Sequence, residues 1–265
     1  MGLVRARKER RDSVTDKILA DRANHLARIR ATAPCPQLMG QLKALGLGSK
    51  KRPRDSGRFR QAQDDHGRRV ASHMGAGGFS QYMGSASKDW PNFKHRLPEI
   101  ALAGHTNCGK STLVNTLAGI HPRKGPAGVS ERAGWTDYVS FYQVGKKPPV
   151  LTLVDLPGYG HAVASQPAMR EWWRMIKDYL DTRKQLCRCC VLVDCTRGLC
   201  EEDRQLLSFL AKRGIDYQVV LTKADLVNTQ DMASCITLLQ ADLHDFLGTP
   251  PPLHPPPPNS PGFPP

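Results

Sequence analysis

One short segment has the residue types and the spacing to hold the phosphates of a nucleotide. Residues 104–111 read Gly-His-Thr-Asn-Cys-Gly-Lys-Ser and match the pattern G-x-x-x-x-G-K-[S/T]. Gly104 and Gly109 permit the backbone to turn successive N–H groups toward the β- and γ-phosphates. Lys110 supplies a positive charge to these phosphates, and Ser111 offers a hydroxyl to Mg²⁺. The predicted nucleotide-binding residues here are Gly104, His105, Thr106, Asn107, Cys108, Gly109, Lys110, Ser111 and Thr112.

A second motif follows the apolar run 150–154. This run predicts a buried strand, and Asp155-Leu156-Pro157-Gly158 closes it. An acidic residue at the end of a neighbouring strand belongs to a Mg²⁺ site, and the N–H of Gly158 can reach the γ-phosphate. Thr136, between the two motifs, offers a hydroxyl and a carbonyl that complete the Mg²⁺ shell. We therefore predict a metal site of Ser111, Thr136 and Asp155 and catalytic roles for Lys110, Thr136 and Gly158.

A third motif selects the base. The run 217–221 is followed by Thr222-Lys223-Ala224-Asp225, which fits [N/T]-K-x-D. The Asp225 carboxylate would accept hydrogen bonds from N1–H and from the exocyclic N2–H₂ of guanine, a donor pair that adenine lacks. The pattern therefore favours GTP over ATP, with Thr222, Lys223, Asp225 and, from the second motif, Asp155 and Gly158 added to the nucleotide site.

The elements that must position these motifs alternate between strands and helices. Apolar runs at 98–103 and 189–194 predict buried parallel strands. Periodic segments predict helices at 172–186, 201–212 and 230–247. This alternation predicts an α/β fold, the P-loop NTPase fold of the Ras-like G domain, with a mainly parallel sheet flanked by helices.

Composition divides the chain into three parts. Of the net charge of +14, most lies at the front: residues 1–99 hold 21 Lys+Arg against 9 Asp+Glu, and residues 100–265 hold 17 against 15. Ten of the 21 prolines fall in residues 250–265. We therefore expect a basic, partly helical and largely flexible arm and linker over 1–78, a G domain over 79–248 and a disordered proline-rich tail over 249–265.

The basic arm favours a phosphate-bearing partner, because each phosphate that is neutralised releases a counterion. A solvated extension without a partner is the alternative. The arginines of the basic arm suit a mitochondrial presequence, although acidic residues interrupt them. The run Lys50–Arg54 resembles a nuclear import signal. We expect a mitochondrial location, with cytoplasm or nucleus as alternatives. No run of about 18 apolar residues exists, which excludes a transmembrane helix. The start of the chain lacks the charged, apolar and small-residue regions of a signal peptide, so we do not expect a secretory signal.

The motifs together resemble the EngB family of GTPases, also called YihA or YsxC, from about residue 79 to residue 247. The most specific piece is Asp-Leu-Pro-Gly-Tyr-Gly at 155–160. The resemblance also includes Ser85-Ala86, the stretch 130–136, Trp173, Tyr179, Leu180, Arg183 and Leu186. It implies GTP and Mg²⁺ as ligands and a role in assembling the large ribosomal subunit in bacteria, mitochondria or plastids. The implied partner is a large-subunit precursor or its rRNA. We also expect the protein to be a monomer that does not insert into a membrane.

Two positions bear on the reaction rate. Tyr159 stands where Ras-like GTPases carry a glutamine that orients the attacking water, so we expect slow turnover that depends on a partner. Asn107 matches an asparagine that helps bind K⁺ in related GTPases, and plain loop packing is the alternative. His105-Thr106 departs from the usual Arg-Ser of the family.

The resemblance stops before the end of a complete domain of this family. After Asp225 the family requires a helix, a sixth strand, a guanine-capping Ser-Ala loop and a last helix. After Leu247 this chain has a proline-rich segment, which forms neither an interior strand nor a helix. We therefore expect the last strand and helix to be missing, either in a truncated product or in a divergent form that completes its sheet in another way.

Three other hypotheses are open. The cluster Cys187, Cys189, Cys190, Cys195 and Cys200 could hold zinc, but the paired C-x-x-C spacing is missing, which favours structural thiols. A ribosome- or RNA-binding scaffold that no longer hydrolyses GTP is the main rival function. A regulatory GTPase at membranes is disfavoured, because no lipidation motif or hydrophobic anchor is present.

Overall fold

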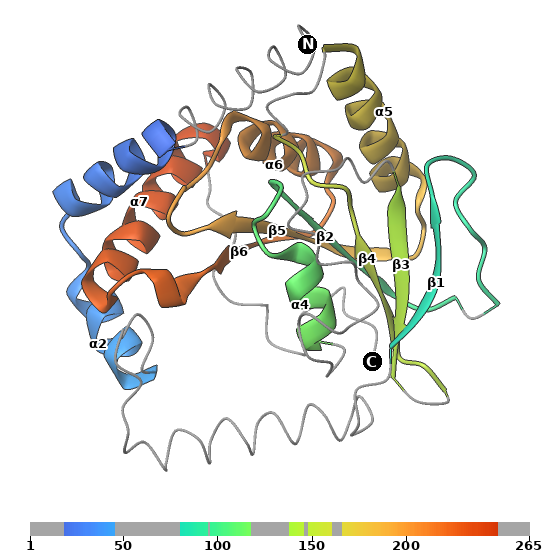
Figure 1. Cartoon of the computed structure of the whole chain (residues 1–265), viewed down its shortest axis with the longest axis horizontal. Coiled ribbons are helices and arrows are strands. Elements are labelled where there is room, and N and C mark those ends of the chain that lie inside the picture. Colours follow the sequence, from blue (N-terminus) through green and yellow to red (C-terminus); the bar gives the residue numbers. More distant parts are fainter. Residues whose placement is uncertain are drawn as a thin grey trace, which may run out of the picture.

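The computed structural model describes residues 19–45, 80–94, 96–117, 138–145, 148–160 and 166–248. Six strands in these ranges form one sheet in the order β1-β3-β4-β2-β5-β6 (Figure 1). The four strands from β4 to β6 in this order run parallel, β3 is antiparallel to β4, and β1 is antiparallel to β3. Their bounds are β1 Ser80–Ala86, β2 Glu99–Gly104, β3 Val139–Val144, β4 Leu151–Asp155, β5 Leu186–Asp194 and β6 Tyr217–Thr222. The predicted mainly parallel sheet is confirmed.

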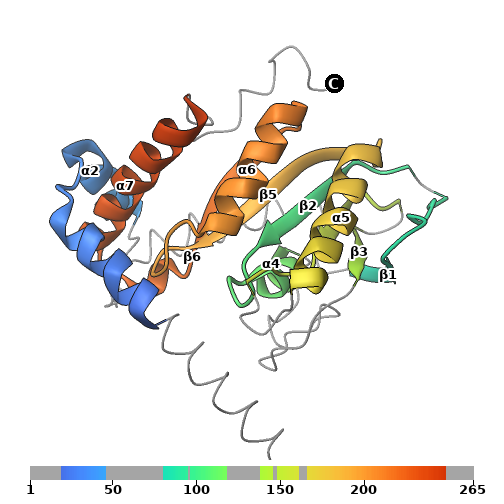
Figure 2. The same ribbon diagram turned by 90° about the horizontal axis from the view of Figure 1, so that it is seen from above.

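Helices cover both faces of this sheet. Helices α5 and α6 lie on one face and α4 lies on the other (Figures 1 and 2). Helix α7 packs beside α6 near the edge strand β6, and a helix over residues 19–31 together with α2 flanks α7. The bounds are α2 Pro36–Leu45, α4 Lys110–Leu117, α5 Gln166–Thr182, α6 Glu201–Arg213 and α7 Thr229–Leu247, with a 3-10 turn at Ala224–Leu226. None of the helices described is long and apolar enough to cross a membrane.

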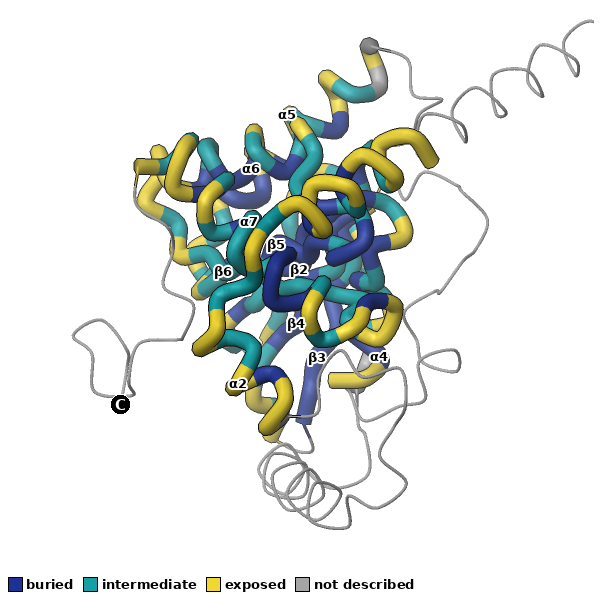
Figure 3. Tube along the Cα trace, turned by 90° about the vertical axis from the view of Figure 1, so that its left-hand side faces the viewer, coloured by how far each residue is buried: buried dark blue, intermediate teal, exposed yellow. Residues whose placement is uncertain are grey.

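The central strands are buried on both faces, as the continuous apolar runs predicted. Along β5, Cys189, Val191 and Val193 face the α5–α6 side, and Cys190 and Leu192 face the α4 side. This alternation follows from the two-residue period of a strand. Figure 3 shows the result, with buried residues at the centre of the sheet and exposed residues on the outer faces of the helices.

The end of α5 differs from the prediction. The sequence pattern extended this helix to Leu186, whereas α5 ends at Thr182 and Leu186 opens β5 beside Glu99. A buried ion pair fixes this boundary: the Arg183 guanidinium donates to both carboxylate oxygens of Glu99, with Nη2 2.6 Å from Oε1. The Tyr179 hydroxyl also donates to Glu99, over 3.0 Å. Tyr179 and Arg183, two residues of the family motif, therefore bind the carboxylate of the first residue of β2.

The described part of the predicted basic arm is not an extension. Ile29 of the 19–31 helix is fully buried and Leu42 of α2 is 6% exposed. Both belong to a cluster with residues of α7 and of the loops at the strand ends, namely Cys195, Val227, Met232, Ala233 and Cys235. The apolar side chains of residues 19–45 are thus buried against α7 and these loops, and the predicted domain boundary at residue 79, which lies among residues outside the described ranges, stays a prediction.

Polar contacts also attach residues 19–45, called the N-terminal flank below, to the rest of the protein. The Arg28 guanidinium pairs with the Asp242 carboxylate over 2.9 Å, and the Ser234 hydroxyl donates to the Thr32 carbonyl over 2.8 Å. His25 is buried over Gly198, where a Cβ would approach the imidazole to 2.3 Å. Burial lowers the pKa of His25. The N-terminal flank therefore touches the loop that follows β5, close to the predicted nucleotide site.

The predicted proline-rich tail, residues 249–265, lies outside the described residues. Within the described ranges, β6 is the edge strand and α7 is the last helix. The predicted loss of a closing strand and helix therefore stays a prediction.

Candidate functional site

The predicted phosphate-binding loop joins the end of β2 to the start of α4. Its backbone takes positive φ at Gly104 (147°), Asn107 (63°) and Gly109 (108°). At Gly104 a Cβ would lie 2.5 Å from the Leu192 carbonyl oxygen, so any side chain there would clash with β5. These conformations produce the tight loop that the glycine spacing predicted, and α4 begins at Lys110.

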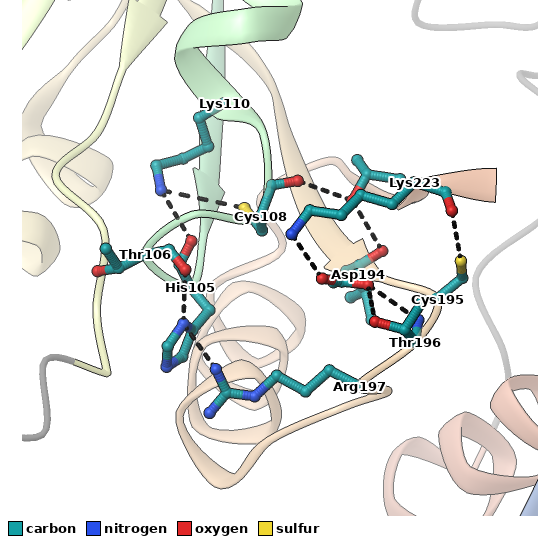
Figure 4. A network of polar contacts seen from close by, with 11 residues as sticks. His105, Thr106, Cys108, Lys110, Asp194, Cys195, Thr196, Arg197 and Lys223 are labelled. Atoms are coloured by element: carbon teal, nitrogen blue, oxygen red, sulfur yellow. Dashed lines mark hydrogen bonds and ion pairs between the residues drawn. The ribbon is translucent and has the colours of Figure 1, made fainter. Parts of the chain in front are cut away.

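Lys110 points back into this loop. Its ammonium donates to the Gly104 carbonyl over 2.8 Å and to the His105 carbonyl over 3.1 Å, and it lies 4.0 Å from the Cys108 sulfur (Figure 4). The side chain is only 8% exposed. A cation is therefore held within the loop at the place where phosphates are predicted to bind.

Asp155 and Ser111 form the described part of the predicted metal site. The Ser111 hydroxyl donates to Oδ2 of Asp155 over 2.9 Å. The other oxygen, Oδ1, is buried and has no hydrogen-bond partner among the described residues. Burial raises the pKa of Asp155, and Lys110 and Ser111 act in the opposite direction. A buried carboxylate oxygen beside a hydroxyl suits Mg²⁺, which prefers oxygen ligands.

The second motif lies across the phosphate-binding loop. The Thr106 N–H donates to the Tyr159 carbonyl over 2.8 Å, and His105 and Tyr159 form a parallel bridge. At Gly158 a Cβ would lie 2.8 Å from Nζ of Lys110 and 3.0 Å from Oγ1 of Thr106. The absence of a side chain at Gly158 therefore lets its backbone approach the predicted phosphate position.

The Tyr159 side chain turns away from this position. It is 1% exposed, and its hydroxyl donates to the Asp203 carboxylate at the start of α6. Burial, followed by Asp203, raises its pKa well above the ordinary value. The ring meets the edge of Trp172 at 5.3 Å, and the Trp172 indole N–H donates to the Pro157 carbonyl over 3.1 Å. The phenol therefore anchors the second motif to α5 and α6.

The third motif is joined to the phosphate-binding loop. The Thr222 hydroxyl donates to the Cys108 carbonyl over 2.7 Å. Lys223 has a positive φ of 57°, and its ammonium pairs with the Asp194 carboxylate over 2.7 Å (Figure 4). Asp225 is exposed in the 3-10 turn that follows, where its carboxylate is accessible to a base. The three motifs therefore meet at one end of the sheet.

Sequence reasoning missed a group of residues in the loop after β5. The Asp194 carboxylate accepts from the backbone N–H and the hydroxyl of Thr196 over 2.9 and 2.7 Å. Arg197 lies 2.8 Å from Nδ1 of His105, and burial, aided by Arg197, lowers the pKa of His105 to about 4. Asp194 ends a buried strand, as Asp155 does, so the same signal could have found it. No local pattern marks Arg197, which is 92 residues from His105.

Other predicted residues are placed in part. Thr112 lies in the first turn of α4, and its carbonyl accepts from Thr116 over 2.8 Å. Thr136 lies outside the described residues, and so do the arm segments at 1–18 and 46–78. In the described ranges, no three His, Cys, Asp or Glu side chains gather as a zinc site would require. Burial raises the pKa of Cys189 and Cys195, which suits structural thiols.

Comparisons with known proteins add the family context. The profile of a family described as "50S ribosome-binding GTPase" matches residues 99–223, which include the phosphate-binding loop and Asp155 but end before Asp225. The protein named "Probable GTP-binding protein EngB" of Rhodospirillum rubrum is 40% identical over 150 residues, which make up 56% of this chain and 64% of that protein. The chain thus spans less than two thirds of that relative.

Other relatives are covered more fully. The "Probable GTP-binding protein EngB" of Caldanaerobacter subterraneus subsp. tengcongensis is 36% identical over 59% of this chain and 78% of its own length. The "Probable GTP-binding protein EngB" of Anaplasma phagocytophilum is 39% identical over 58% of this chain and 75% of its own length. A crystal structure titled "a probable GTP-binding protein engB" has 23% identity and a TM-score of 0.42, over 57% of this chain and 82% of that one.

Proposed function

Because the chain belongs to the EngB family of GTP-binding proteins, we propose that it is a GTPase switch that assists assembly of the large ribosomal subunit. One observation carries the nucleotide part: Cys108 lies in the phosphate-binding loop, and its carbonyl accepts from Thr222 of the guanine motif. The loop that holds the phosphates and the motif that selects the base are thereby fixed to each other. The ribosomal part is supported by the family description "50S ribosome-binding GTPase".

Guanine selection would rest on Asp225. Titration with labelled GTP and ATP tests it, and we expect binding of GTP alone. Asp225→Asn replaces an acceptor by an amide, so it should weaken GTP binding and favour xanthosine triphosphate, which carries a carbonyl where guanine carries N2–H₂. Lys212→Gln, a change of an exposed residue on α6, serves as the control that leaves GTP binding intact. Equal binding of GTP and ATP by the unaltered chain would contradict the assignment.

Mg²⁺ would be held at Ser111 and Asp155, with Thr136 as a further predicted ligand. The metal would supply charge neutralisation between the phosphates. Lys110 supplies charge to the same phosphates from within the loop, and Gly158 offers its backbone N–H to the γ-phosphate. These groups hold and orient GTP before any bond is broken.

Slow turnover is part of the proposal. Because the Tyr159 phenol is bound to Asp203, it does not orient a water molecule at the γ-phosphate. Asn107 is exposed with a left-handed backbone, and it would help to hold a K⁺ ion, which would supply further positive charge to the phosphates. Hydrolysis should therefore be slow in Na⁺ and faster in K⁺. Equal rates in the two salts would remove the K⁺ role and leave the rest of the proposal standing.

The rival function, a scaffold that no longer hydrolyses GTP, is favoured by the burial of Tyr159. Single-turnover hydrolysis of labelled GTP by the full chain, with and without large-subunit precursors, separates the two. We expect GTP binding, co-sedimentation with the precursors and faster hydrolysis in their presence. Co-sedimentation without GTP binding would establish the scaffold instead. If the chain co-sediments with the precursors in none of the nucleotide states, the ribosomal role is overturned.

The proposed compartment is the mitochondrion, supported by the arginine-rich start of the chain. Imaging of the full chain fused to a fluorescent protein at its C-terminus, beside a form that lacks residues 1–18, tests this. Nuclear fluorescence lost on replacing Lys50–Arg54 by alanines would contradict it and support the import signal.

A further inference from the structure

A groove of about 550 Å³ lies between α5, α6 and the end of α7, on the sheet face opposite α4. The function proposed above makes no use of it. Its lining includes both aromatic and basic side chains, namely Trp173, Lys177, Arg204, Phe209, Lys212 and Phe246. Glu201 is its acidic lining residue.

The cations in this groove lie over aromatic rings. The Lys177 ammonium is 5.3 Å from the centroid of the Trp173 ring and 5.6 Å from that of Phe209. The Arg204 guanidinium carbon is 5.5 Å from the centroid of Phe246. Cation–π contacts of this kind hold a long side chain in one place without neutralising its charge. The groove thus offers ordered positive charge beside ring surfaces.

The charge balance favours an anionic occupant. Lys177 and Lys212 are exposed, and neither has an ion pair with the residues that the structure describes. Arg204 is shared with Asp242, whose nearest oxygen lies 3.3 Å away. With Arg204 partly balanced by Asp242, Lys177 and Lys212 still exceed the one lining carboxylate, Glu201, and this excess of positive charge suits phosphates. Aromatic rings and a guanidinium plane supply surfaces on which unpaired bases stack, and an acidic peptide would not use these surfaces.

The groove is also close to the second nucleotide motif. Trp173 contacts Trp172 edge to face, with ring centroids 5.0 Å apart. Trp172 in turn donates to the Pro157 carbonyl, one residue before Gly158. An occupant that contacts Trp173 therefore lies one side chain away from the segment predicted to meet the γ-phosphate.

From these observations we propose that the α5–α6–α7 groove binds a short single-stranded segment of RNA. Its phosphates pair with Lys177 and Lys212, and its bases stack against Trp173, Phe209 and the Arg204 plane. The proposal rests on the ribosomal role given above, since it names the surface that contacts RNA. It concerns the folded domain and not the basic arm.

Binding of a fluorescein-labelled 12-nucleotide oligouridine to the full chain tests the proposal, measured by anisotropy over a range of salt concentrations. Lys177→Glu combined with Lys212→Glu should weaken binding at least ten-fold and make the slope of log K against log salt shallower by about 1.4, since each contact on a single strand contributes about 0.7. Lys43→Glu combined with Lys88→Glu changes the same charge at exposed sites outside the groove and should reduce affinity much less. Equal losses in the two double variants would overturn the groove.

Two further measurements make the outcome specific. Photocrosslinking of 4-thiouridine RNA should label Trp173 or Phe209, and crosslinks confined to residues 1–78 would overturn the proposal. A polyglutamate peptide that binds as tightly, with the same dependence on Lys177, would replace RNA by an acidic protein as the occupant. GTP titration and thermal unfolding of each variant confirm folding. Normal GTP binding together with loss of RNA binding separates the groove from the proposed GTPase function.

Discussion

Two aspartates, each the last residue of a parallel strand, occupy similar places in the sheet and have opposite surroundings. Asp155 ends β4 and Asp194 ends β5, with β2 between the two strands. One oxygen of Asp155 accepts from Ser111, and the other has no hydrogen-bond partner in the described ranges. Asp194 has partners on both oxygens, Lys223 on Oδ2 and Thr196 on Oδ1.

The pKa shifts of these carboxyl groups follow from this difference. Burial raises the pKa of Asp155 more than Lys110 and Ser111 lower it. Burial also opposes ionisation of Asp194, but hydrogen bonds from Lys223 and Thr196 outweigh it and lower the pKa. Asp194 therefore stabilises the fold as a carboxylate. The carboxylate of Asp155 is retained at a cost in stability, as is common for groups that bind a ligand.

The largest effect is expected from Asp155→Asn, which removes the charge and keeps the shape. GTP affinity in Mg²⁺ should fall about 10–100-fold, because the carboxylate that suits the metal is lost. The free energy of unfolding without nucleotide should stay equal or rise. GTP titration with Mg²⁺ and with EDTA, together with urea unfolding, measures both. A lower stability with unchanged Mg²⁺ dependence would show that Asp155 is structural, like Asp194.

The same substitution at the other strand end should act on the fold. Asp194→Asn loses the ion pair with Lys223 and weakens the bonds from Thr196, so the free energy of unfolding should fall by about 1–3 kcal/mol. Urea unfolding of this variant and of the unaltered chain measures the difference. A stability change within error would mean that the contacts of Asp194 contribute no more than an exposed pair.

The two variants should differ in their pH dependence. The ordinary pKa of aspartate is about 4. The stability from Asp194, with its lowered pKa, is full above that value and is lost as the pH falls through the folded pKa. The cost at Asp155, with its raised pKa, is full above the folded pKa and disappears as the pH falls to about 4.

Unfolding of both variants between about pH 3 and pH 8, each compared with the unaltered chain, therefore has a defined outcome. At neutral pH the free energy of unfolding of Asp194→Asn should be lower than that of the unaltered chain, and this loss should shrink below about pH 4. At neutral pH the free energy of unfolding of Asp155→Asn should equal or exceed that of the unaltered chain, and any gain should vanish as the pH falls. Differences of the same sign at neutral pH would end the contrast between the two sites.

The smallest effect is expected from Thr196→Val. This change removes one hydroxyl donor to Asp194 and keeps both the backbone N–H bond and the Lys223 pair. The free energy of unfolding should fall by about 1 kcal/mol, with GTP affinity unchanged. Combining it with Asp194→Asn should lower the free energy of unfolding by less than the sum of the two single losses, because both changes act on the same contact. Additive losses would mean that Thr196 acts through another neighbour.

The site was predictable where the chemistry is local in sequence. The loop around Gly104, Gly109 and Lys110 is a single short segment, and Asp155 and Thr222 follow apolar runs that also predict strands. Asp194 follows such a run too, but its partner Lys223 is brought to it only by the parallel pairing of β5 with β6. The Arg197 contact with His105 depends on the tertiary fold alone.

The fold was predictable to a similar depth. Periodicity gave the helices α6 and α7 to within one residue, and the mainly parallel sheet followed from the alternation of elements. The sequence also predicted a partly helical basic arm, but it did not show what the helical part packs against. An amphipathic pattern identifies an apolar face, and the partner of that face is a property of the whole chain.

The packing of the 19–31 helix against α7 has a consequence for biosynthesis. The Ser234 hydroxyl that binds the Thr32 carbonyl is translated 202 residues later. At about 5–20 residues per second, the 19–31 helix waits roughly 10–40 s for its partner. Because the residues of α7 that cover Ile29 do not yet exist, Ile29 lacks this cover during that interval. The segment is therefore accessible to chaperones while the chain is being made, and it becomes inaccessible once α7 has folded onto it.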